Sequence, residues 1–330
     1  MMDVFIKEFP KQLKEAVAIG EKAKLTKHSE PIQNIVVLGM GGSGIGGDFA
    51  ASFIRNYSTA PLASSKGYQI PAYVSKNSLV IASSYSGNTE ETLEAFEQAV
   101  KKGSKIVCLT SGGKLLERAK ELGLDYIQVP NTGQPPRACL GYSFVQQLVI
   151  LKFFGFARPN CIEEVKKGIA NLENAQETLH TAAKKAAKKM HGKFPVIYST
   201  DRMEPVGLRF RQQLNENTKI LCVHHVIPEM NHNELVGWRH QEGEFVAIFF
   251  HSADDLNRNK IRMETCKEII TQYADVIDFS CVGDSLIEQA LYGVHYGDWI
   301  SYEMAVLRDM DPVEVKAIDF LKHKLAEAAL

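Results

Sequence analysis

Short apolar runs alternate along the chain with longer segments in which apolar residues recur every three or four positions. Short runs bounded by glycine, proline and small polar residues indicate buried β-strands, and the three-to-four periodicity indicates amphipathic helices. Because parallel strands need long crossover connections, an alternation of strands and helices predicts an α/β fold with mostly parallel sheets flanked by helices. The alternation occurs twice, so the sequence predicts two α/β blocks.

The predicted elements divide the chain into three parts. The first block has predicted strands at 34–38, 79–83, 105–110 and 125–129 and helices at 48–57, 90–102, 114–122 and 142–154. The second has strands at 195–199, 220–223, 244–250 and 275–279 and helices at 206–214, 257–273, 285–307 and 313–325. Residues 161–189, rich in Ala, Glu and Lys with few helix breakers, predict one long helix. We therefore expect an N-terminal domain at 1–155, a helical connector at 156–192 and a C-terminal domain at 193–330.

The composition is that of an average globular protein. The 330 residues include 38 basic and 39 acidic side chains, which gives a net charge of -1, and 45% are hydrophobic. This balance excludes a largely disordered chain and a highly charged nucleic-acid scaffold, so we expect no nucleic-acid partner. No apolar run approaches the roughly 18–20 residues of a membrane span, and the first residues do not resemble a signal peptide. The six cysteines form no CxxC pair, which argues against a zinc finger or redox motif and favours the reducing cytoplasm.

A glycine-rich loop follows the first predicted strand. Gly39, Gly41 and Gly44 match the pattern GxGxxG between a strand and a helix. Glycines allow a tight turn and a close approach of the backbone to an anion, and the N–H groups of a helix N-terminus favour phosphate binding. The acidic residue that a dinucleotide site needs about twenty positions later is missing. Lys66 suits the 2′-phosphate of NADP, so an NADP site is one alternative, and a glycine-rich turn without a ligand is another.

A second loop, residues 83–92, also joins a strand to a helix. Its sequence Ser-Ser-Tyr-Ser-Gly-Asn-Thr-Glu-Glu-Thr places the hydroxyls of Ser84, Ser86 and Thr89 around one turn. Hydroxyl and N–H groups suit a phosphate monoester without help from a lysine. The alternative is ordinary capping of the helix by Thr89. Two such loops at the carboxyl ends of strands, where open α/β sheets bind ligands, favour phosphate binding. Together the two loops resemble a sugar isomerase (SIS) domain, a family that binds phosphosugars through the Ser/Thr loop.

Two polar motifs in the second block carry the candidate chemistry. The first places Glu216 between two asparagines near the end of a predicted helix, where amides can orient the carboxylate; a surface glutamate is the plain alternative. The second places His232 between two asparagines. A histidine titrates near neutrality and suits proton transfer to a sugar ring oxygen, while a hydrogen-bonded structural histidine is the alternative. The spacing of His232 and its neighbouring glutamates matches no tight metal-ligand motif, so we expect no metal.

The whole set of motifs resembles the bifunctional phosphoglucose/phosphomannose isomerases of the SIS superfamily. The matching motifs are Leu-Asn-Glu-Asn-Thr-Lys, Pro-Glu-Met-Asn-His-Asn-Glu, Pro-Arg-Ala at 136–138 and the Leu-Lys pair at 321–322. The match covers roughly residues 34–325. It implies two SIS-type domains, each a three-layer αβα arrangement, with a phosphorylated hexose as substrate and no cofactor.

The resemblance also implies a role for individual residues. Glu216 moves the proton between C1 and C2 of the sugar, Arg137 stabilises the enediolate oxygen, and His232 and a C-terminal lysine assist ring opening. We favour Lys322 for this lysine, with Lys316 as the alternative. The residues that bind the substrate phosphate are Gly42, Ser43, Ser84, Ser86 and Thr89. By the same resemblance we expect a homodimer in which the neighbouring subunit supplies His232.

The activity implied is the interconversion of glucose 6-phosphate, and of mannose 6-phosphate, with fructose 6-phosphate. Residues 311–314 lack the hydroxyl that relatives often carry there, so mannose activity is less secure than glucose activity. One competing hypothesis is a phosphosugar-binding sensor without turnover, against which the motifs around Glu216 and His232 argue. The other is an NADP-dependent oxidoreductase, against which the hydroxyl-rich second loop argues.

Overall fold

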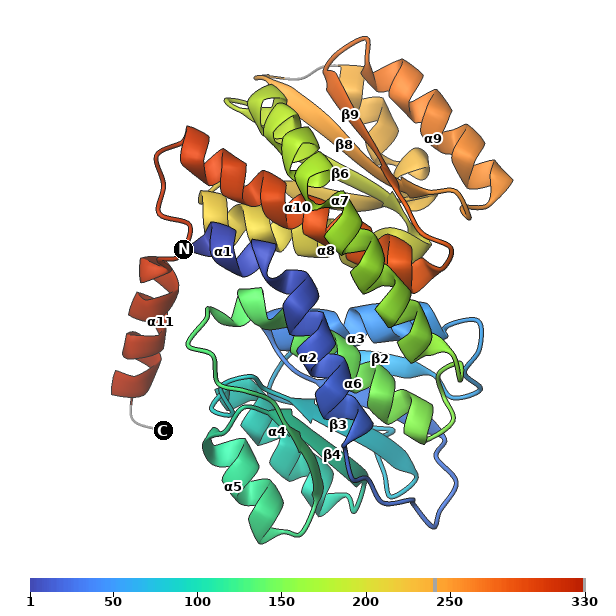
Figure 1. Ribbon diagram of the computed structural model, residues 1–330, viewed down its shortest axis with the longest axis vertical. Helices are drawn as coiled ribbons and strands as arrows, with labels where there is room; N and C mark the ends of the chain where they lie inside the picture. The colour runs from blue at the N-terminus through green and yellow to red at the C-terminus, as the bar shows by residue number, and fades with distance from the viewer. Residues whose placement is uncertain (240–241, 329–330) are drawn as a thin grey trace. The chain divides into compact units, whose positions relative to one another are not determined.

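The computed structural model describes residues 1–239 and 242–328. The chain divides into two compact units. The first, here called the N-terminal unit, consists of Lys7–Gln176 and Cys281–Tyr292. The second, the C-terminal unit, consists of Met1–Ile6, Glu177–Ser280 and Gly293–Leu330. Each unit is built around one sheet with helices against it (Figure 1), so the predicted α/β class is confirmed.

The sheet of the N-terminal unit has the strand order β2-β1-β3-β4-β5. Its strands are β1 (Asn34–Leu38), β2 (Leu62–Ser65), β3 (Ser78–Ser83), β4 (Lys105–Thr110) and β5 (Asp125–Gln128). All four pairings are parallel, with Val36 opposite Val80 and Val80 opposite Ile106. The central strand β3 is buried along its whole length, as a parallel strand covered on both faces should be.

Helices cover both faces of this sheet (Figure 1). They are α2 (Phe9–Glu21), α3 (Gly41–Ile54) and α6 (Leu140–Phe153) on one face and α4 (Glu90–Lys101) and α5 (Gly113–Glu121) on the other. Val80 points toward α4 and α5, where it joins Phe96 and Leu115 in one buried cluster. Under the opposite helices, the rings of Phe49 and Phe144 meet edge to face with centroids 5.4 Å apart.

The sheet of the C-terminal unit has the order β7-β6-β8-β9. Its strands are β6 (Phe194–Thr200), β7 (Val223–Ile227), β8 (Phe245–Ser252) and β9 (Asp275–Cys281). β6 pairs in parallel with both β7 and β8. On one face Phe249 packs with Met263 of α9 (Asn257–Ile270). On the other, Phe250 meets Phe210 of α8 (Glu204–Gln213) and Tyr296 of α10 (Leu286–Leu307), with ring centroids 5.4 and 6.3 Å away.

The remaining elements are helices and short turns between these layers. They are α1 (Met2–Lys7), α7 (Cys161–Met190), α11 (Lys316–Glu327), η1 (Pro136–Cys139), η2 (Asp201–Met203), η3 (Leu214–Thr218), η4 (Glu229–His232) and η5 (Glu234–Arg239). The long helix predicted at 161–189 is confirmed as α7. No helix in the part of the chain that the structure describes is long and apolar enough to span a membrane.

Three differences from the predicted elements have a physical reason. The strand predicted at 220–223 is wrong, because β7 begins only at Val223. After α8 the chain continues as the π-helical turn η3, which ends at Thr218. Lys219 follows with a left-handed φ of 56°, and residues 220–222 then connect this turn to the sheet. The helix predicted from residue 48 begins at Gly41, inside the glycine loop. Strand β2 was not predicted, because its sequence Leu-Ala-Ser-Ser has no apolar run.

Helix α10 contains a fully buried histidine. His295 has no exposed surface, and the indole N–H of Trp299 donates to its Nε2 over 3.2 Å, which requires this nitrogen to be unprotonated. Burial lowers the pKa of His295 to about 3, and the nearby His180 adds to the effect. A histidine in an unfolded chain titrates near pH 6.5. Between these two values the unfolded state binds more protons than the folded state, so the folded state loses stability as the pH falls.

We expect acidification from about pH 7 to about pH 4.5 to lower the free energy of unfolding more steeply in the wild type than in His295→Gln. The glutamine oxygen can accept the Trp299 N–H but does not titrate. The two slopes should differ by up to about 1.4 kcal/mol per pH unit below pH 6, as measured by urea unfolding. His191→Gln, at an exposed position, is the control and should keep the wild-type slope. Equal slopes for wild type and His295→Gln would contradict a neutral buried His295.

Candidate functional site

The loop after β3 directs two hydroxyl groups toward each other at the N-terminus of α4. Ser84 is 1% exposed, and its Oγ lies 2.8 Å from Oγ1 of Thr89 and accepts the Gly87 N–H over 3.1 Å. Thr89 occupies the N-cap position of α4, yet within the described chain its side chain makes no capping hydrogen bond. The hydroxyl of Thr89 therefore does not serve as a cap, and the first N–H groups of α4 have no partner inside the helix. A phosphate oxygen at this point would meet both kinds of donor.

Gly87 makes this turn possible. Its φ is +71°, and a Cβ at this position would lie 1.8 Å from the carbonyl oxygen of Gly112. No residue with a side chain fits without a shift of the backbone. Ser86 lies exposed on the same turn, where its Oγ accepts the Asn88 N–H over 3.2 Å. In this structure the Ser86 hydroxyl therefore stabilises the turn through the backbone of Asn88.

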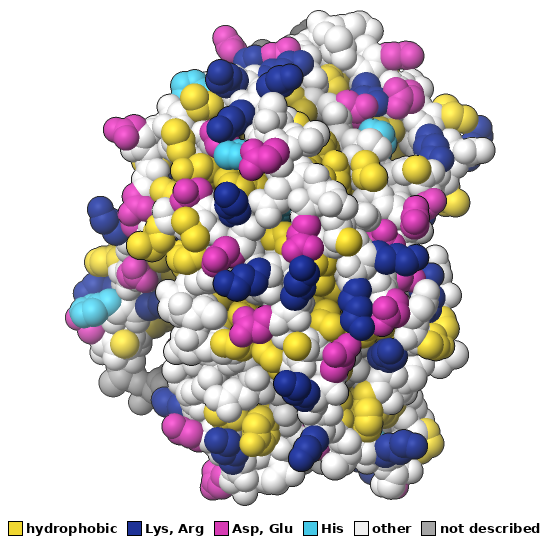
Figure 2. Space-filling model, viewed as in Figure 1, with side chains coloured by type: hydrophobic (Ala, Val, Ile, Leu, Met, Phe, Trp, Pro, Cys, Tyr) yellow, Lys and Arg dark blue, Asp and Glu magenta, His cyan; other side chains and the backbone are white. Residues whose placement is uncertain are grey.

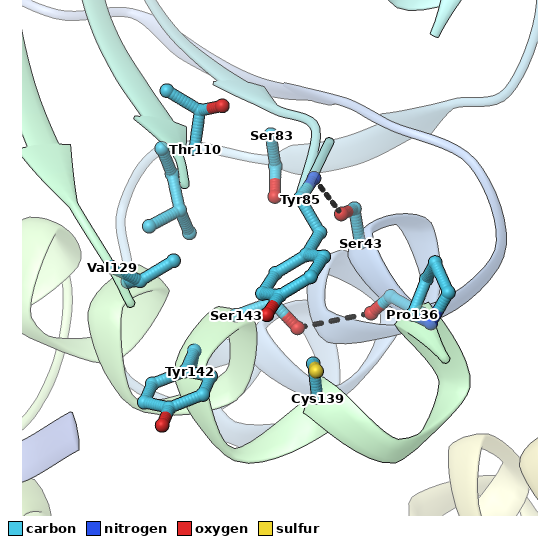
Figure 3. A pocket seen from close by; sticks show the side chains of 11 residues that line it. Ser43, Ser83, Tyr85, Thr110, Val129, Pro136, Cys139, Tyr142 and Ser143 are labelled. Atoms are coloured by element: carbon cyan, nitrogen blue, oxygen red, sulfur yellow. Dashed lines mark hydrogen bonds between the residues drawn. The ribbon is translucent and has the colours of Figure 1, made fainter. Parts of the chain in front are cut away.

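The glycine loop and the Ser/Thr loop are joined by a hydrogen bond. Ser43 lies in the first turn of α3, and its Oγ accepts the backbone N–H of Tyr85 over 3.3 Å (Figure 3). The carbonyl of Gly42 accepts the hydroxyl of Ser143 on α6 over 2.9 Å. A Cβ at Gly44 would lie 2.5 Å from the carbonyl oxygen of Gly39, so the spacing of these glycines allows the loop to fold onto itself. This close approach of Gly44 to Gly39 explains the GxGxxG pattern without a bound dinucleotide.

The cation on which an NADP site would depend is engaged elsewhere. The Lys66 ammonium forms an ion pair with the carboxylate of Asp48 on α3. This pairing offsets the charge that a 2′-phosphate would need. The pairing therefore counts against the NADP alternative.

Arg137 lies in η1, directly beside the glycine loop. The residue is 5% exposed. Its Cα lies 3.8 Å, and the carbonyl oxygen of Pro136 3.0 Å, from the position that a Cβ on Gly42 would take. The structure therefore brings η1 against the start of α3, within the same unit as both loops. A buried arginine whose backbone lies at the start of α3 favours an anionic ligand.

A small pocket opens between these segments (Figure 3). Ser43 and Tyr85 line it from the two loops, and Cys139 and Ser143 line it from η1 and α6. The Tyr85 hydroxyl donates to the carbonyl of Pro130 over 3.0 Å, which ties the loop to the segment after β5. Burial raises the pKa of the Tyr85 phenol and of the Cys139 thiol. Both groups therefore stay neutral near pH 7 and add no negative charge that would repel a phosphate.

Glu216 lies half-buried in η3, the π-helical turn that follows α8. The amide of Asn215 donates to the carbonyl of Ile220 over 2.7 Å, and the amide of Asn217 donates to Oγ of Ser301 over 2.9 Å. Both flanking asparagines thus hold the turn that carries the carboxylate. A π-helical turn is rare and is found often at functional sites.

Lys219 ends the motif Leu-Asn-Glu-Asn-Thr-Lys, but the sequence assigned it no role. Its ammonium donates to the carbonyl of Glu216 over 2.8 Å and to that of Asp311 over 2.6 Å, and it lies 3.7 Å from the Glu314 carboxylate. It therefore connects the Glu216 turn with the segment that leads into α11. A lysine after a helix gives no sign of such long-range contacts, so the sequence offered no signal for them.

His232 and Lys322 both have exposed side chains. His232 is the last residue of η4, and Lys322 lies on α11, a helix that buries none of its described residues. Lys316, the alternative lysine, is the first residue of α11 and is exposed as well. Across the described residues no group of three or more His, Cys, Asp or Glu side chains could hold a metal ion.

The surface carries charges of both signs. Lys and Arg side chains are interspersed with Asp and Glu across the face shown in Figure 2. The net charge of -1 fits this mixture. On this face the charges of both signs alternate, so no concentrated positive patch forms there.

Comparison with known proteins identifies the family. Residues 30–155 match the SIS domain, and residues 179–325 match the family described as bacterial phospho-glucose isomerase C-terminal SIS domain. The chain is 38% identical over 329 residues to the bifunctional phosphoglucose/phosphomannose isomerase of Caldicellulosiruptor bescii, covering 96% of this chain and 97% of that protein. The chain belongs to the bifunctional phosphoglucose/phosphomannose isomerase family. The family predicted from the motifs is thus confirmed.

Two further comparisons agree with this family. The protein of the same name from Aquifex aeolicus is 38% identical over 309 residues, covering 92% of this chain and 94% of that protein. Among solved structures, the C-terminal domain of glucosamine-fructose-6-phosphate aminotransferase from Francisella tularensis superposes with a TM-score of 0.75. It shares 15% identity and covers 95% of this chain and 98% of that chain, a likeness that shows the fold. The two SIS domains expected from the sequence are confirmed.

We expect Thr89→Val to weaken phosphate binding and to leave the fold intact. The substitution removes one of the two paired hydroxyls but keeps the size of the side chain. Loss of a hydrogen bond to a charged group costs about 1.5–3 kcal/mol, so the dissociation constant of inorganic phosphate should rise about tenfold or more. Phosphate-dependent thermal stabilisation measures this constant.

Thr92→Val, one turn further along α4 at a buried position, is the matched control. It should bind phosphate as the wild type does. Unchanged phosphate stabilisation in Thr89→Val would contradict a phosphate site at the Ser/Thr loop.

Proposed function

We propose that this chain is an aldose–ketose isomerase that interconverts glucose 6-phosphate and mannose 6-phosphate with fructose 6-phosphate. Its relatives along nearly the whole chain carry this pair of isomerase activities in their names. The observation that carries the proposal is the paired hydroxyls of Ser84 and Thr89 at the uncapped start of α4, found in the described part of the chain. An isomerase of this kind is an intramolecular oxidoreductase, since one carbon of the sugar is oxidised as its neighbour is reduced.

The phosphate end of the substrate is held by the two loops. Gly42, Ser43, Ser84 and Thr89 supply N–H and hydroxyl donors, and Ser86 supplies a further hydroxyl at the rim of the turn. A phosphate bound there contributes binding energy away from the reacting carbons, which orients the sugar and lowers the entropic part of the barrier.

Glu216 is the base that moves the proton. In the direction from glucose 6-phosphate, its carboxylate takes the proton from C2 of the open-chain aldose, and the electron pair of that C–H bond forms the C1–C2 double bond of a cis-enediolate. Return of the same proton to C1, with transfer of the hydroxyl proton from O2 to O1, gives the ketose. Atoms and electrons balance without a metal or a redox cofactor. A carboxylate held on an anchored turn suits such repeated transfer.

Arg137 stabilises the oxygen that becomes negative in the enediolate. A guanidinium remains charged at any relevant pH, and its fixed position at η1 avoids reorganisation during the reaction. His232 and Lys322 assist ring opening by moving protons to and from the ring oxygen and the anomeric hydroxyl, with Lys316 as the alternative lysine. Their exposed positions suit groups that meet a sugar from outside the core.

We also infer that the protein acts as a homodimer, in which one subunit supplies His232 to the other. His232 is exposed in the single chain, as a residue reserved for a neighbouring copy would be. A cytoplasmic location agrees with the six cysteines, all of which are buried thiols.

We expect Glu216→Gln to abolish the formation of both glucose 6-phosphate and mannose 6-phosphate from fructose 6-phosphate. The amide keeps the shape of the side chain but cannot take the proton, so kcat should fall by about 10²–10⁴-fold. Separate coupled assays for the two aldoses, run with a chelator, measure both products.

Three results would speak against parts of the proposal. Substantial activity in Glu216→Gln would remove this residue from the role of base. Formation of glucose 6-phosphate alone by the wild type would restrict the function to one epimer and give weight to the missing hydroxyl at 311–314. Phosphosugar binding with no turnover in the wild type would favour the sensor hypothesis.

Mixing two inactive variants tests the shared site. A dimer of one Glu216→Gln subunit and one His232→Ala subunit contains one site with both native residues, if each site draws His232 from the partner. Random mixing should then restore about a quarter of the wild-type activity. Each variant mixed with itself is the control. If the mixture is no more active than its components, both residues of a site come from one subunit or the protein is not a dimer.

A further inference from the structure

The turn that carries Glu216 is bound to α10 by a buried polar network. Asn217 and Ser301 are both fully buried, and the amide of Asn217 donates to Oγ of Ser301 over 2.9 Å. The next residue, Thr218, is also fully buried and donates its hydroxyl to the carbonyl of Ser301 over 2.9 Å. One residue of α10 therefore binds two consecutive residues of the turn, immediately after Glu216.

The hydroxyl of Ser301 has a defined direction. Its single proton is donated to the carbonyl of Asp298 over 2.7 Å, so toward Asn217 the oxygen can act only as an acceptor. The carboxylate of Asp298 in turn accepts from Arg209 over 2.8 Å and from Gln213 over 2.9 Å, both on the helix that leads into the turn. The helix before Glu216 and the residues after it are thus held by the same short stretch of α10.

We propose that Asn217 and Ser301 act as positioning residues, which set the place of the Glu216 carboxylate relative to the substrate carbons. The proposal rests on the proposed function, because it takes Glu216 to be the base. A proton transfer between two adjacent carbons needs the carboxylate within reach of both, and a misplacement of about 1 Å can cost on the order of 10²-fold in rate. Neither residue needs to touch the sugar for this effect.

Each side chain that contacts the Glu216 turn holds a different part of it. A π-helical turn replaces the i→i+4 hydrogen bonds of an α-helix with i→i+5 bonds, and side-chain contacts add to these bonds here. Asn215 and Lys219 bind backbone carbonyls at its two ends, over 2.7 and 2.8 Å. The Asn217 amide and the Thr218 hydroxyl both join the turn to α10, and only the contact from Asn217 runs to a side chain, the hydroxyl of Ser301. Loss of this contact should let the turn shift while the helices stay in place.

The test is steady-state kinetics of Ser301→Ala, Asn217→Ala and the double variant, with glucose 6-phosphate and its C2-deuterated form. We expect each single variant to lower kcat by about 10- to 100-fold and to change KM by less than about threefold. The deuterium isotope effect on kcat should rise, because proton abstraction becomes the slow step. The double variant should be within about threefold of the slower single variant, because both substitutions remove the same contact.

Ile300→Val is the matched control. It shortens a fully buried side chain beside Ser301 that has no polar atom, so it should lower the melting temperature but leave kcat and the isotope effect unchanged. If Ser301→Ala does not fold, Asn217→Ser takes its place, since the shorter hydroxyl side chain stays polar but does not span the distance to Ser301.

Two failures are distinguishable. If Glu216→Gln is inactive but the Ser301 and Asn217 variants keep the wild-type kcat and isotope effect, the positioning role is wrong and the proposed function stands. If Glu216→Gln is itself active, the base has been misassigned, and both proposals fall together. A loss of kcat in Ile300→Val equal to that in Ser301→Ala would also overturn the positioning role, because it would then be a general effect of stability.

Discussion

The buried ion pair between Arg209 and Asp298 is the contact on which the polar interior of the C-terminal unit depends. Both residues are almost fully buried, and both carboxylate oxygens of Asp298 are occupied, one by Arg209 and one by Gln213. Burial raises the pKa of Asp298, and the guanidinium beside it opposes that change. Removing one partner of such a pair leaves an uncompensated charge, at a cost of about 3–5 kcal/mol. These contacts favour one register of α8 against α10. Because the chain runs straight from α8 into the Glu216 turn, that register also decides where the carboxylate lies.

In the N-terminal unit, hydrogen bonds between uncharged groups hold the two loops in place. Its loops must keep N–H and hydroxyl groups available at the ends of β1 and β3, and a polar loop without internal bonds would be mobile. The hydrogen bond from Tyr85 to Ser43 joins the two loops, and the pairing of Ser84 with Thr89 fixes the hydroxyls before any ligand arrives. Preorganised donors lose little entropy on binding. In each unit, then, a long-range polar contact fixes a proposed site segment: Tyr85 to Ser43 in the N-terminal unit and Asn217 to Ser301 in the C-terminal unit.

Local signals explain which features could be predicted from the sequence. The strand-loop-helix plan, the glycine loop, the Ser/Thr loop and the Glu216 turn each depend on a few consecutive residues, so apolar runs, glycines and hydroxyls reveal them. The start of β7 and the π-helical turn depend on where α10 holds residues 217 and 218, a contact that spans more than eighty positions. Ser301 and Asp298 gave no signal, because a serine and an aspartate in an apolar helix resemble ordinary polar interruptions. The role of Ser301 and Asp298 becomes visible only in the fold, which brings Asn217 to Ser301 and Arg209 to Asp298.

The glycine loop shows why a motif alone does not decide a ligand. The pattern at Gly39, Gly41 and Gly44 fits a dinucleotide fold equally well, since both folds need a tight turn from a strand into a helix. In this structure the close approach of Gly44 to Gly39 accounts for the spacing. The features that discriminate are chemical: Lys66 is paired with Asp48, and Thr89 turns its hydroxyl to Ser84 rather than to its own helix. A threonine in the N-cap position would ordinarily stabilise its helix by about 1 kcal/mol through a side-chain cap. Thr89 does not make this cap, so the first N–H groups of α4 lack a side-chain acceptor. A phosphate bound at this turn would supply that acceptor, which explains why the hydroxyl of Thr89 can pair with Ser84 instead.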